Sequence, residues 1–234
     1  MRPVTRGPRP LNPDGTSKTY ATYDTARRDL IERMGQYCSY CNQNLPASLA
    51  VEHVQPKDLV PALRLEWDNF LLGCTNCNST KGATPVNLSD FIWPDLHNTH
   101  NAFVYLPDGT VEVNTNLDTT LQEKAQKLLR LVGLQKYPDN PTASDRRWLN
   151  RRETYQKALV VLNLYTQVVN TEQKTEFEQL IGILVAENGF FSIWMQVFDQ
   201  YTDVKHQIIQ ALPGTASEAF DANANPLNRI PNEL

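Results

Sequence analysis

The cysteines constrain this chain most, because all four fall into two Cys-x-x-Cys pairs: Cys38 with Cys41, and Cys74 with Cys77. A two-residue gap lets both sulfurs of a pair face one ion, and two pairs supply the four thiolates of a tetrahedral zinc site. Thirty-two residues separate the pairs, against about 15–20 in a zinc ribbon. We therefore predict a structural zinc ion around an insert larger than a hairpin. Two disulfides or four unrelated buried thiols are the alternative.

The location of the protein bears on that choice. The first ten residues carry three arginines but no apolar stretch of the kind found in secretory signals, and no apolar run is long enough to cross a bilayer. We expect a cytoplasmic protein without a membrane partner. In a reducing cytosol, paired cysteines are metal ligands more often than disulfides.

Residues suited to phosphodiester hydrolysis lie between and just after the cysteine pairs. This reaction needs a hard cation on oxygen ligands, a base for water and a positive group near the phosphate. Glu52 and Asn78 offer the oxygens, and His53 has a pKa suited to a base near neutral pH. Lys81 is a candidate phosphate contact. Neighbouring side chains on a strand face opposite ways, but Pro56 ends this strand, so Glu52 and His53 can address one site.

The order of these motifs resembles the HNH endonuclease family over about residues 37–82. The resemblance rests on Cys38-x-x-Cys41, Glu52-His53, Trp67-Asp-Asn-Phe-Leu-Leu72 and Cys74-x-x-Cys77-Asn-x-x-Lys-Gly82. It implies that His53 is the general base and that Glu52 and Asn78 are the two protein ligands of a catalytic metal ion. It also implies that Asn69 braces the loop carrying His53. Because Asn78 takes the place of a nitrogen ligand, Mg²⁺ or Mn²⁺ is expected instead of a catalytic zinc.

The same resemblance implies a mechanism. His53 deprotonates a water for in-line attack on phosphorus, while one metal ion neutralises charge on the non-bridging oxygen and on the leaving 3′ oxygen. The products carry a 5′ phosphate and a 3′ hydroxyl.

A further resemblance, to the PtuB nuclease component of Septu anti-phage systems, covers roughly the first 165 residues. It is carried by Met1-Arg-Pro-Val-x-Arg-Gly7, Tyr37-Cys-Ser-Tyr-Cys41, Val51-Glu-His-Val-Gln-Pro-Lys57 and Asp145-Arg-Arg-Trp148. This family also occurs in some retrons. The resemblance implies an ABC- or SMC-like ATPase partner (PtuA) that restrains or licenses the nuclease, and as further partners a retron reverse transcriptase with its RNA–DNA product.

Hydrophobic periodicity and turn residues predict a small mixed α/β unit followed by a mostly helical half, an α+β protein. The resemblance to the HNH family implies that the first unit is a zinc-clamped ββα-metal core. We expect helices at 20–34 (stopped by Gly35), 119–132, 145–169 (capped by Ser144), 172–186 and 190–212, a short strand at 49–54, another ordered segment at 67–72, a hairpin at 103–113, and a tail from Pro213.

These elements divide the chain into four regions. They are a basic arm and helix (1–36), the HNH core (37–90), a hairpin and helix extension (91–135), and a helical partner-docking region with a flexible tail (136–234).

Charge is unevenly distributed along the sequence. The net charge is −4, yet residues 171–234 hold three Lys/Arg against nine Asp/Glu, while basic residues gather in the first ten positions and again at 146–157. Arg146, Arg147 and Arg151 are therefore candidate nucleic-acid contacts. A solvated helix start or an ion-paired partner face explains the same cluster equally well.

Several other residues allow two interpretations. Asp95 is a candidate third oxygen ligand, and His97 and His100 are candidates to approach the site or ordinary surface residues. An aromatic stripe on Phe190, Phe191, Trp194, Met195 and Phe198 indicates either core packing or a protein interface.

The sequence thus predicts a metal-dependent endonuclease that acts in anti-phage defence, on DNA or on RNA such as tRNA. The alternative is a nuclease-derived zinc module that binds nucleic acid or protein without cleaving.

Overall fold

The computed structural model describes residues 1–137, 145–230 and 234. Its helices and strands, in chain order, are α1 (Arg27–Met34), β1 (Leu49–His53), β2 (Phe70–Cys74), α2 (Thr75–Lys81), α3 (Thr99–Ala102), β3 (Phe103–Tyr105), β4 (Val111–Val113), α4 (Thr119–Leu131), α5 (Arg147–Val168), α6 (Lys174–Asn188), α7 (Phe191–Val197) and α8 (Thr202–Ala211). This is the α+β class expected from the sequence. Among the described residues, no helix combines the length and the apolar character needed to cross a membrane.

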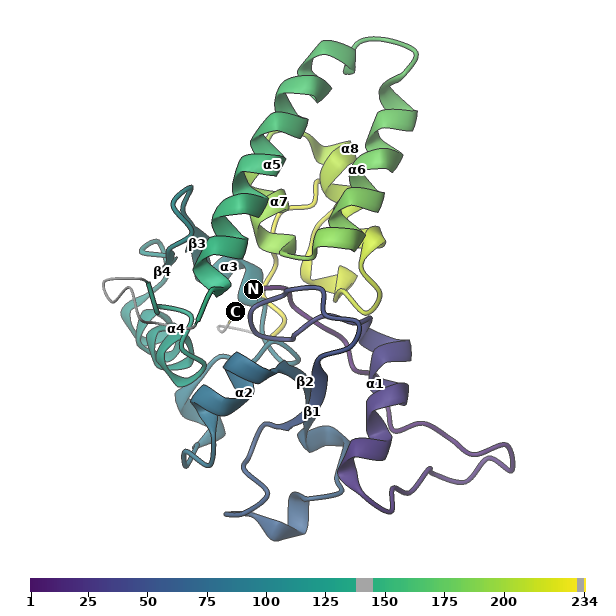
Figure 1. The fold of residues 1–234 in the computed structure, drawn as a ribbon, viewed down its shortest axis with the longest axis vertical. Coiled ribbons are helices and arrows are strands. Elements are labelled where there is room, and N and C mark those ends of the chain that lie inside the picture. Colours follow the sequence, from purple (N-terminus) through teal and green to yellow (C-terminus); the bar gives the residue numbers. More distant parts are fainter. Residues whose placement is uncertain (138–144, 231–233) are drawn as a thin grey trace.

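The lower half of Figure 1 contains an antiparallel pair of strands, β1 and β2, with the helix α2 beside it. β1 pairs with β2 from Leu49 opposite Cys74 to His53 opposite Phe70. The chain enters α2 without a loop, because Cys74 both ends β2 and caps the helix, its sulfur accepting a hydrogen bond from the Cys77 amide. This β1–β2–α2 unit is the ββα arrangement that the sequence predicts.

The extension after α2 matches its prediction closely. β3 and β4 form a hairpin around Asp108 and Gly109, and α4 begins with the Asp118 carboxylate accepting a hydrogen bond from the Leu121 amide. Gly133, with φ of 67°, follows the end of α4, as expected of a helix stop.

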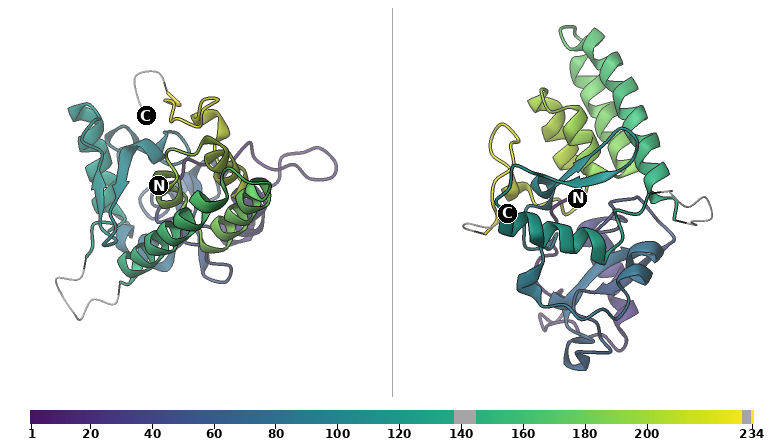
Figure 2. Two further views of the ribbon diagram at one scale, coloured as in Figure 1. Left: turned by 90° about the horizontal axis from the view of Figure 1, so that it is seen from above. Right: turned by 90° about the vertical axis from the view of Figure 1, so that its left-hand side faces the viewer.

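The helical half is dominated by α5 and α6, which run side by side as a hairpin away from the strands (Figures 1 and 2). The proposed Ser144 cap of α5 lies outside the described residues; within them, the Asp145 carboxylate accepts a hydrogen bond from the Arg147 amide. The single helix expected at 190–212 is instead two, α7 and α8. α7 is buried on nearly all sides, so the chain turns at Phe198 and α8 returns to pack on α6.

Apolar side chains form two cores. One fills the space around β1, β2, α1 and α4, and the other lies among α5, α6, α7 and α8. The aromatic stripe belongs to these cores: Phe190, Phe191, Trp194, Met195 and Phe198 are each at most 4% exposed. The core-packing interpretation of this stripe is therefore confirmed, and the stripe is not an interface.

Both ends of the described chain pack onto the body, unlike the flexible tail expected after Pro213. Val4 pairs with Thr215, and the Asn98 side-chain amide donates to the carbonyls of Ala219 and Leu227. The guanidinium of Arg2 is buried and donates to the carbonyls of Met34 and Pro213. The sequence missed this because the segment is rich in Pro, Ala and Asn, and only tertiary contacts order it.

The hairpin of α5 and α6 is joined to the loop of the first cysteine pair. The Phe190 amide donates to the Asn42 carbonyl at 2.8 Å, and the Asn44 side chain donates to the carbonyls of Ala186 and Glu187. Gly189 has φ of 72°, and any Cβ there would collide with the Asn42 carbonyl. The turn after α6 therefore requires glycine at this position.

Candidate active site

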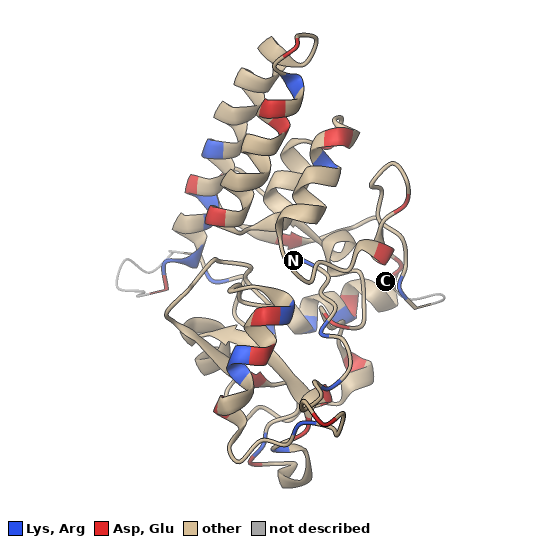
Figure 3. Cartoon of the chain, turned by 90° about the vertical axis from the view of Figure 1, so that its right-hand side faces the viewer, with Lys and Arg blue, Asp and Glu red and all other residues tan. Residues whose placement is uncertain are grey.

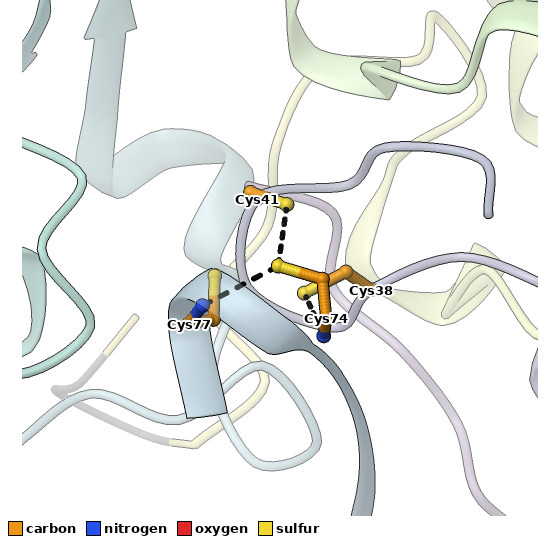
Figure 4. Close-up of side chains that lie close together, drawn as sticks. All are labelled: Cys38, Cys41, Cys74 and Cys77. Carbon is orange, nitrogen blue, oxygen red and sulfur yellow. Dashed lines mark hydrogen bonds between the residues drawn. The ribbon is translucent and has the colours of Figure 1, made fainter. Parts of the chain in front are cut away.

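The four cysteine sulfurs converge from the loop after α1 and from the β2–α2 junction (Figure 4). All four are buried thiols outside any disulfide, and their sulfur atoms lie within 4.8 Å of one another. A zinc ion at about 2.3 Å from each sulfur requires sulfurs about 3.8 Å apart, and Cys41 and Cys74 are 3.7 Å apart. The cluster therefore fits a zinc ion, and two disulfides are excluded in this structure.

Hydrogen bonds around the cluster favour thiolates. The Cys74 amide donates to the Cys38 sulfur, and the Arg147 guanidinium donates to the Cys77 sulfur at 2.9 Å. Burial raises the pKa of the Cys77 thiol well above its ordinary value. Four thiolates without a cation would repel one another, and a bound Zn²⁺ together with the Arg147 guanidinium would offset most of this negative charge.

Two arginines of the predicted cluster, Arg147 and Arg151, belong to this packing and not to a phosphate surface. The Arg147 side chain is buried and also donates to the carbonyls of Val132 and Gly133 and to the Asp145 carboxylate. Arg151 is buried as well and donates to the carbonyls of Gly109 and Leu134. Neither side chain is available to a nucleic acid, which corrects the expectation for both. Arg146 is exposed.

A cavity of about 210 Å³ lies between the end of β1 and α2. It is lined by Glu52, His53, Pro56, Lys57, Asp58, Asn78, Lys81, Gly82 and Ala83. The register of β1 places neighbouring side chains on opposite faces, but the chain bends away after His53, and both Glu52 and His53 line the cavity. The sequence-predicted base, the two predicted ligands and the predicted phosphate contact are therefore brought together.

Gly73 makes this proximity possible. A Cβ at this position would lie 3.1 Å from the Glu52 Cβ and 3.6 Å from the Asn78 Cβ, so the missing side chain leaves a gap in which these two residues meet. The Glu52 carboxylate is buried, and its Oε1 atom faces the Lys81 ammonium at 2.8 Å without hydrogen-bond alignment. A buried carboxylate beside an amide side chain offers the oxygen ligands that a divalent cation such as Mg²⁺ prefers.

His53 is oriented by contacts that define its protonation. Its Nε2 lies 3.0 Å from the Arg64 carbonyl, which can only accept, so Nε2 carries the proton and Nδ1 keeps its lone pair. The ring packs edge-on against Tyr23 and Phe70. Burial lowers the pKa of His53, as do nearby cationic side chains, against the opposing effect of the bond to Arg64. The imidazole is therefore neutral near pH 7, as a base must be.

Asn69 braces the segment that follows His53. Its side-chain oxygen accepts from the Gln55 amide at 2.7 Å, and its amide group donates to the carbonyls of Gln55 and Leu63. The Asn69 carbonyl accepts from the Val54 amide. Both ends of the turn after β1 are held by this one residue.

Lys81 points inward, unlike a phosphate contact. Its side chain is 1% exposed, and its ammonium lies 2.8 Å from Glu52 Oε1, without hydrogen-bond alignment, and 2.6 Å from the His53 carbonyl. Burial raises the pKa of the Glu52 carboxyl, and the Lys81 charge counteracts this.

The remaining histidines and Asp95 lie elsewhere. Asp95 pairs with Arg6 at 3.1 Å beside a different pocket. His97 accepts a hydrogen bond from the Trp93 amide, and His100 is half-buried, with its Nδ1 atom 3.0 Å from the Ser192 hydroxyl. None of the three lines the cavity at Glu52.

Sequence reasoning missed three residues near the cavity. Lys57 and Asp58 line it, and Arg64, whose carbonyl binds His53, has an exposed side chain. Pro56 marks the turn that follows Glu52 and His53 in the sequence. Residues directly after this turn, such as Lys57 and Asp58, could have been expected near the cavity on that ground.

Comparison with known proteins agrees with this geometry. Residues 38–84 match the HNH endonuclease family, a span that includes all four cysteines and the cavity residues Glu52, His53, Asn78 and Lys81. This segment is an HNH endonuclease domain.

The chain is also similar to the Septu protein PtuB of Bacillus thuringiensis, to which it is 33% identical over 75 residues, 31% of this chain and 29% of that protein. The alignment thus spans less than a third of that protein. Both resemblances inferred from the sequence are confirmed at this extent.

Proposed function

We propose that this chain is a metal-dependent endonuclease that hydrolyses nucleic-acid phosphodiesters as the effector of an anti-phage defence system. The observation that carries the proposal is the meeting of Glu52, His53 and Asn78 in one cavity of an HNH domain. DNA is the proposed substrate, and RNA such as tRNA is the alternative that the same chemistry serves, because such a site addresses the backbone and not the bases.

The chain's own residues divide the work. The Nδ1 atom of His53 takes a proton from water, and the Arg64 carbonyl, already bonded to Nε2, stabilises the imidazolium that forms. Glu52 and Asn78 would hold a single Mg²⁺ or Mn²⁺, which supplies charge neutralisation at the phosphate and the leaving oxygen. Asn69 keeps the His53 segment in place.

Lys57 and Arg64 replace the buried arginines as proposed phosphate contacts. Both are near enough to lower the pKa of His53 by their charge, and Lys57 lines the cavity. Lys57 is also held over the Tyr23 ring at 5.3 Å. Two cations flanking the base are placed to position a backbone phosphate on either side of the scissile bond.

A cleavage assay tests the proposal. Zinc-loaded protein, co-expressed with its genomic neighbours, is incubated with Mg²⁺ and plasmid DNA, single-stranded DNA or tRNA. We expect His53→Ala to abolish cleavage while retaining nucleic-acid binding. His206→Ala, on α8 and away from the cavity, is the matched control and is expected to cleave as wild type does. A wild type that binds but never cuts with any neighbour supplied supports the non-cleaving zinc module instead.

We further propose that the hairpin of α5 and α6 docks an ABC- or SMC-like ATPase, as the resemblance to PtuB implies. An apolar groove of about 580 Å³ runs along α5, with Val160, Val161 and Leu184 among its lining residues. Val160 and Ile183 are each 61% exposed, and Leu164 and Leu180 are exposed as well. Exposed apolar side chains gathered on one element mark an interaction surface.

The charge pattern suits a protein partner better than a polyanion. Figure 3 shows Lys/Arg and Asp/Glu interspersed over both halves of the molecule, without a large surface of one sign. We expect Ile183→Glu with Val160→Glu to abolish co-purification of the ATPase encoded nearby. Leu11→Glu is the control, because Leu11 is equally exposed at 64% but lies in the N-terminal segment. Undiminished co-purification of the double variant would refute docking at this hairpin.

A further inference from the structure

Lys81 is a buried lysine, and both groups that it contacts belong to β1, the strand that carries Glu52 and His53. It lies in the last turn of α2, and its ammonium reaches the Glu52 carboxylate and the His53 carbonyl. A lysine loses its hydration on burial and is found fully buried only when paired. The side chain therefore acts on the residues of the cavity and not on a ligand outside it.

The cavity that results has balanced charge. Its two carboxylates, Glu52 and Asp58, are matched by two ammonium groups, Lys57 and Lys81. Neither the Asn78 amide nor the His53 imidazole adds negative charge to this cavity. Cation affinity at oxygen sites rises with the number of charged ligands. A divalent cation that entered this cavity alone would meet no net negative charge and would have to share Glu52 with an ammonium.

We propose that Lys81 makes divalent-cation binding at this site depend on nucleic acid. This rests on the proposed function, because it assigns the missing negative charge to the phosphodiester. Glu52 and Asn78 would hold the cation, and the phosphodiester would supply the negative charge that the cavity lacks. Lys81 stays bonded to the His53 carbonyl and keeps Glu52 beside Asn78. Without nucleic acid, Lys81 occupies the place of the second positive charge and the site stays without a cation.

Lys81 acts through Glu52, so it is a positioning residue. Its removal is expected to strengthen metal binding. Loss of most residues near a metal site weakens metal binding. Lys81→Met retains most of the length of the side chain, removes the competing charge, and leaves Glu52 free to bind a cation. We expect this variant to bind Mn²⁺ at least about tenfold more tightly than its parent in the absence of nucleic acid.

The test is a titration with Mn²⁺, followed by the electron paramagnetic resonance signal of the free ion, on the zinc-loaded full chain. Every protein carries His53→Ala, so that the oligonucleotide stays intact. The parent, Lys81→Met and Lys136→Met are each titrated with and without a short DNA duplex. Lys136 is the matched control, because it contacts Thr80 of the same helix but does not line the cavity.

We expect the parent and Lys136→Met to show saturable Mn²⁺ binding only with DNA, and Lys81→Met to show it with or without DNA. Equal binding by the parent in both conditions would overturn the proposal, as would unchanged or weaker binding by Lys81→Met. Should Lys81→Met fail to fold even with Mn²⁺ present, the DNA dependence of the parent alone decides.

The outcome is separable from that of the proposed activity. DNA-dependent Mn²⁺ binding in a wild type that never cleaves would retain the role of Lys81 and reject the nuclease. Cleavage by a wild type that binds Mn²⁺ equally with and without DNA would support the nuclease and reject the role of Lys81.

Discussion

Arg147 gives the sharpest test of the structure, because its sequence context indicates a phosphate contact while its contacts are internal. The side chain is 3% exposed and donates to the Cys77 sulfur and to the carbonyls of Val132 and Gly133, each at 2.9 Å, and pairs with Asp145. Arg147→Met keeps much of the apolar stem but removes every one of these bonds. It leaves a buried thiolate and two buried carbonyls without their donor.

The expected loss is large. Removing one partner of a buried ionic network costs about 3–5 kcal/mol, because the remaining groups stay buried and unpaired. For a chain of this size, each kcal/mol lowers the melting temperature by about 2–4 °C. We therefore expect Arg147→Met to melt roughly 6–20 °C below wild type, and to release zinc at lower temperature than wild type does.

The assay combines thermal unfolding by circular dichroism with zinc release to a chromogenic chelator. Arg146→Met is the matched control, since the neighbouring side chain is exposed, and it should melt within about 1–2 °C of wild type. An Arg147→Met protein that melts like this control, yet has lost affinity for nucleic acid, would refute the internal role and restore the phosphate contact.

Three further predictions concern the site. Gly73→Ala should weaken Mn²⁺ binding in the presence of DNA, because the new Cβ lies 3.1 Å from the Glu52 Cβ and displaces Glu52 by tenths of an ångström. Cleavage should fall by less than the roughly 100-fold expected of a 1 Å misplacement. A variant with wild-type Mn²⁺ affinity would contradict this. Asn69→Ala should cost about 1–3 kcal/mol in chemical denaturation by leaving the Gln55 amide unpaired, and should abolish cleavage while zinc content is retained; an active variant would show that the brace is dispensable. Cys74→Ser, or chelation of zinc from wild type, should abolish the cooperative thermal transition of the domain, since ligation is folding energy; an unchanged melting curve would reject a structural zinc.

The local patterns of the sequence were sufficient for the centre of the fold. Two Cys-x-x-Cys pairs fix which segments meet, and a strand stopped by Pro56 places Glu52 and His53 near α2. These signals lie within a few residues of the groups they position. The hairpin at Asp108 and Gly109 was predictable for the same reason, because the turn residues specify it locally.

What the sequence could not show depends on contacts between distant segments. Arg147 and Lys81 look like surface cations, and only the positions of Cys77 and Glu52 in space reveal that both are internal. The break between α7 and α8 has no glycine or proline to mark it, since the burial of Phe198 and its neighbours causes it. The order of the segment after Pro213 likewise comes from pairing with the first residues of the chain.

The contact between Arg147 and Cys77 also bears on whether the HNH segment can fold when it is separated from the rest of the chain. The segment that matches the family ends at residue 84, yet a ligand of its four-cysteine cluster is hydrogen-bonded by the first residue of α5, and the loop between Cys41 and β1 is bonded to the turn after α6. A fragment cut at the boundary of the motif would keep all four cysteines and lose the groups that shield and neutralise them. The HNH segment is therefore not an independently folding unit, and truncations or fusions that preserve it must retain the chain through residue 190.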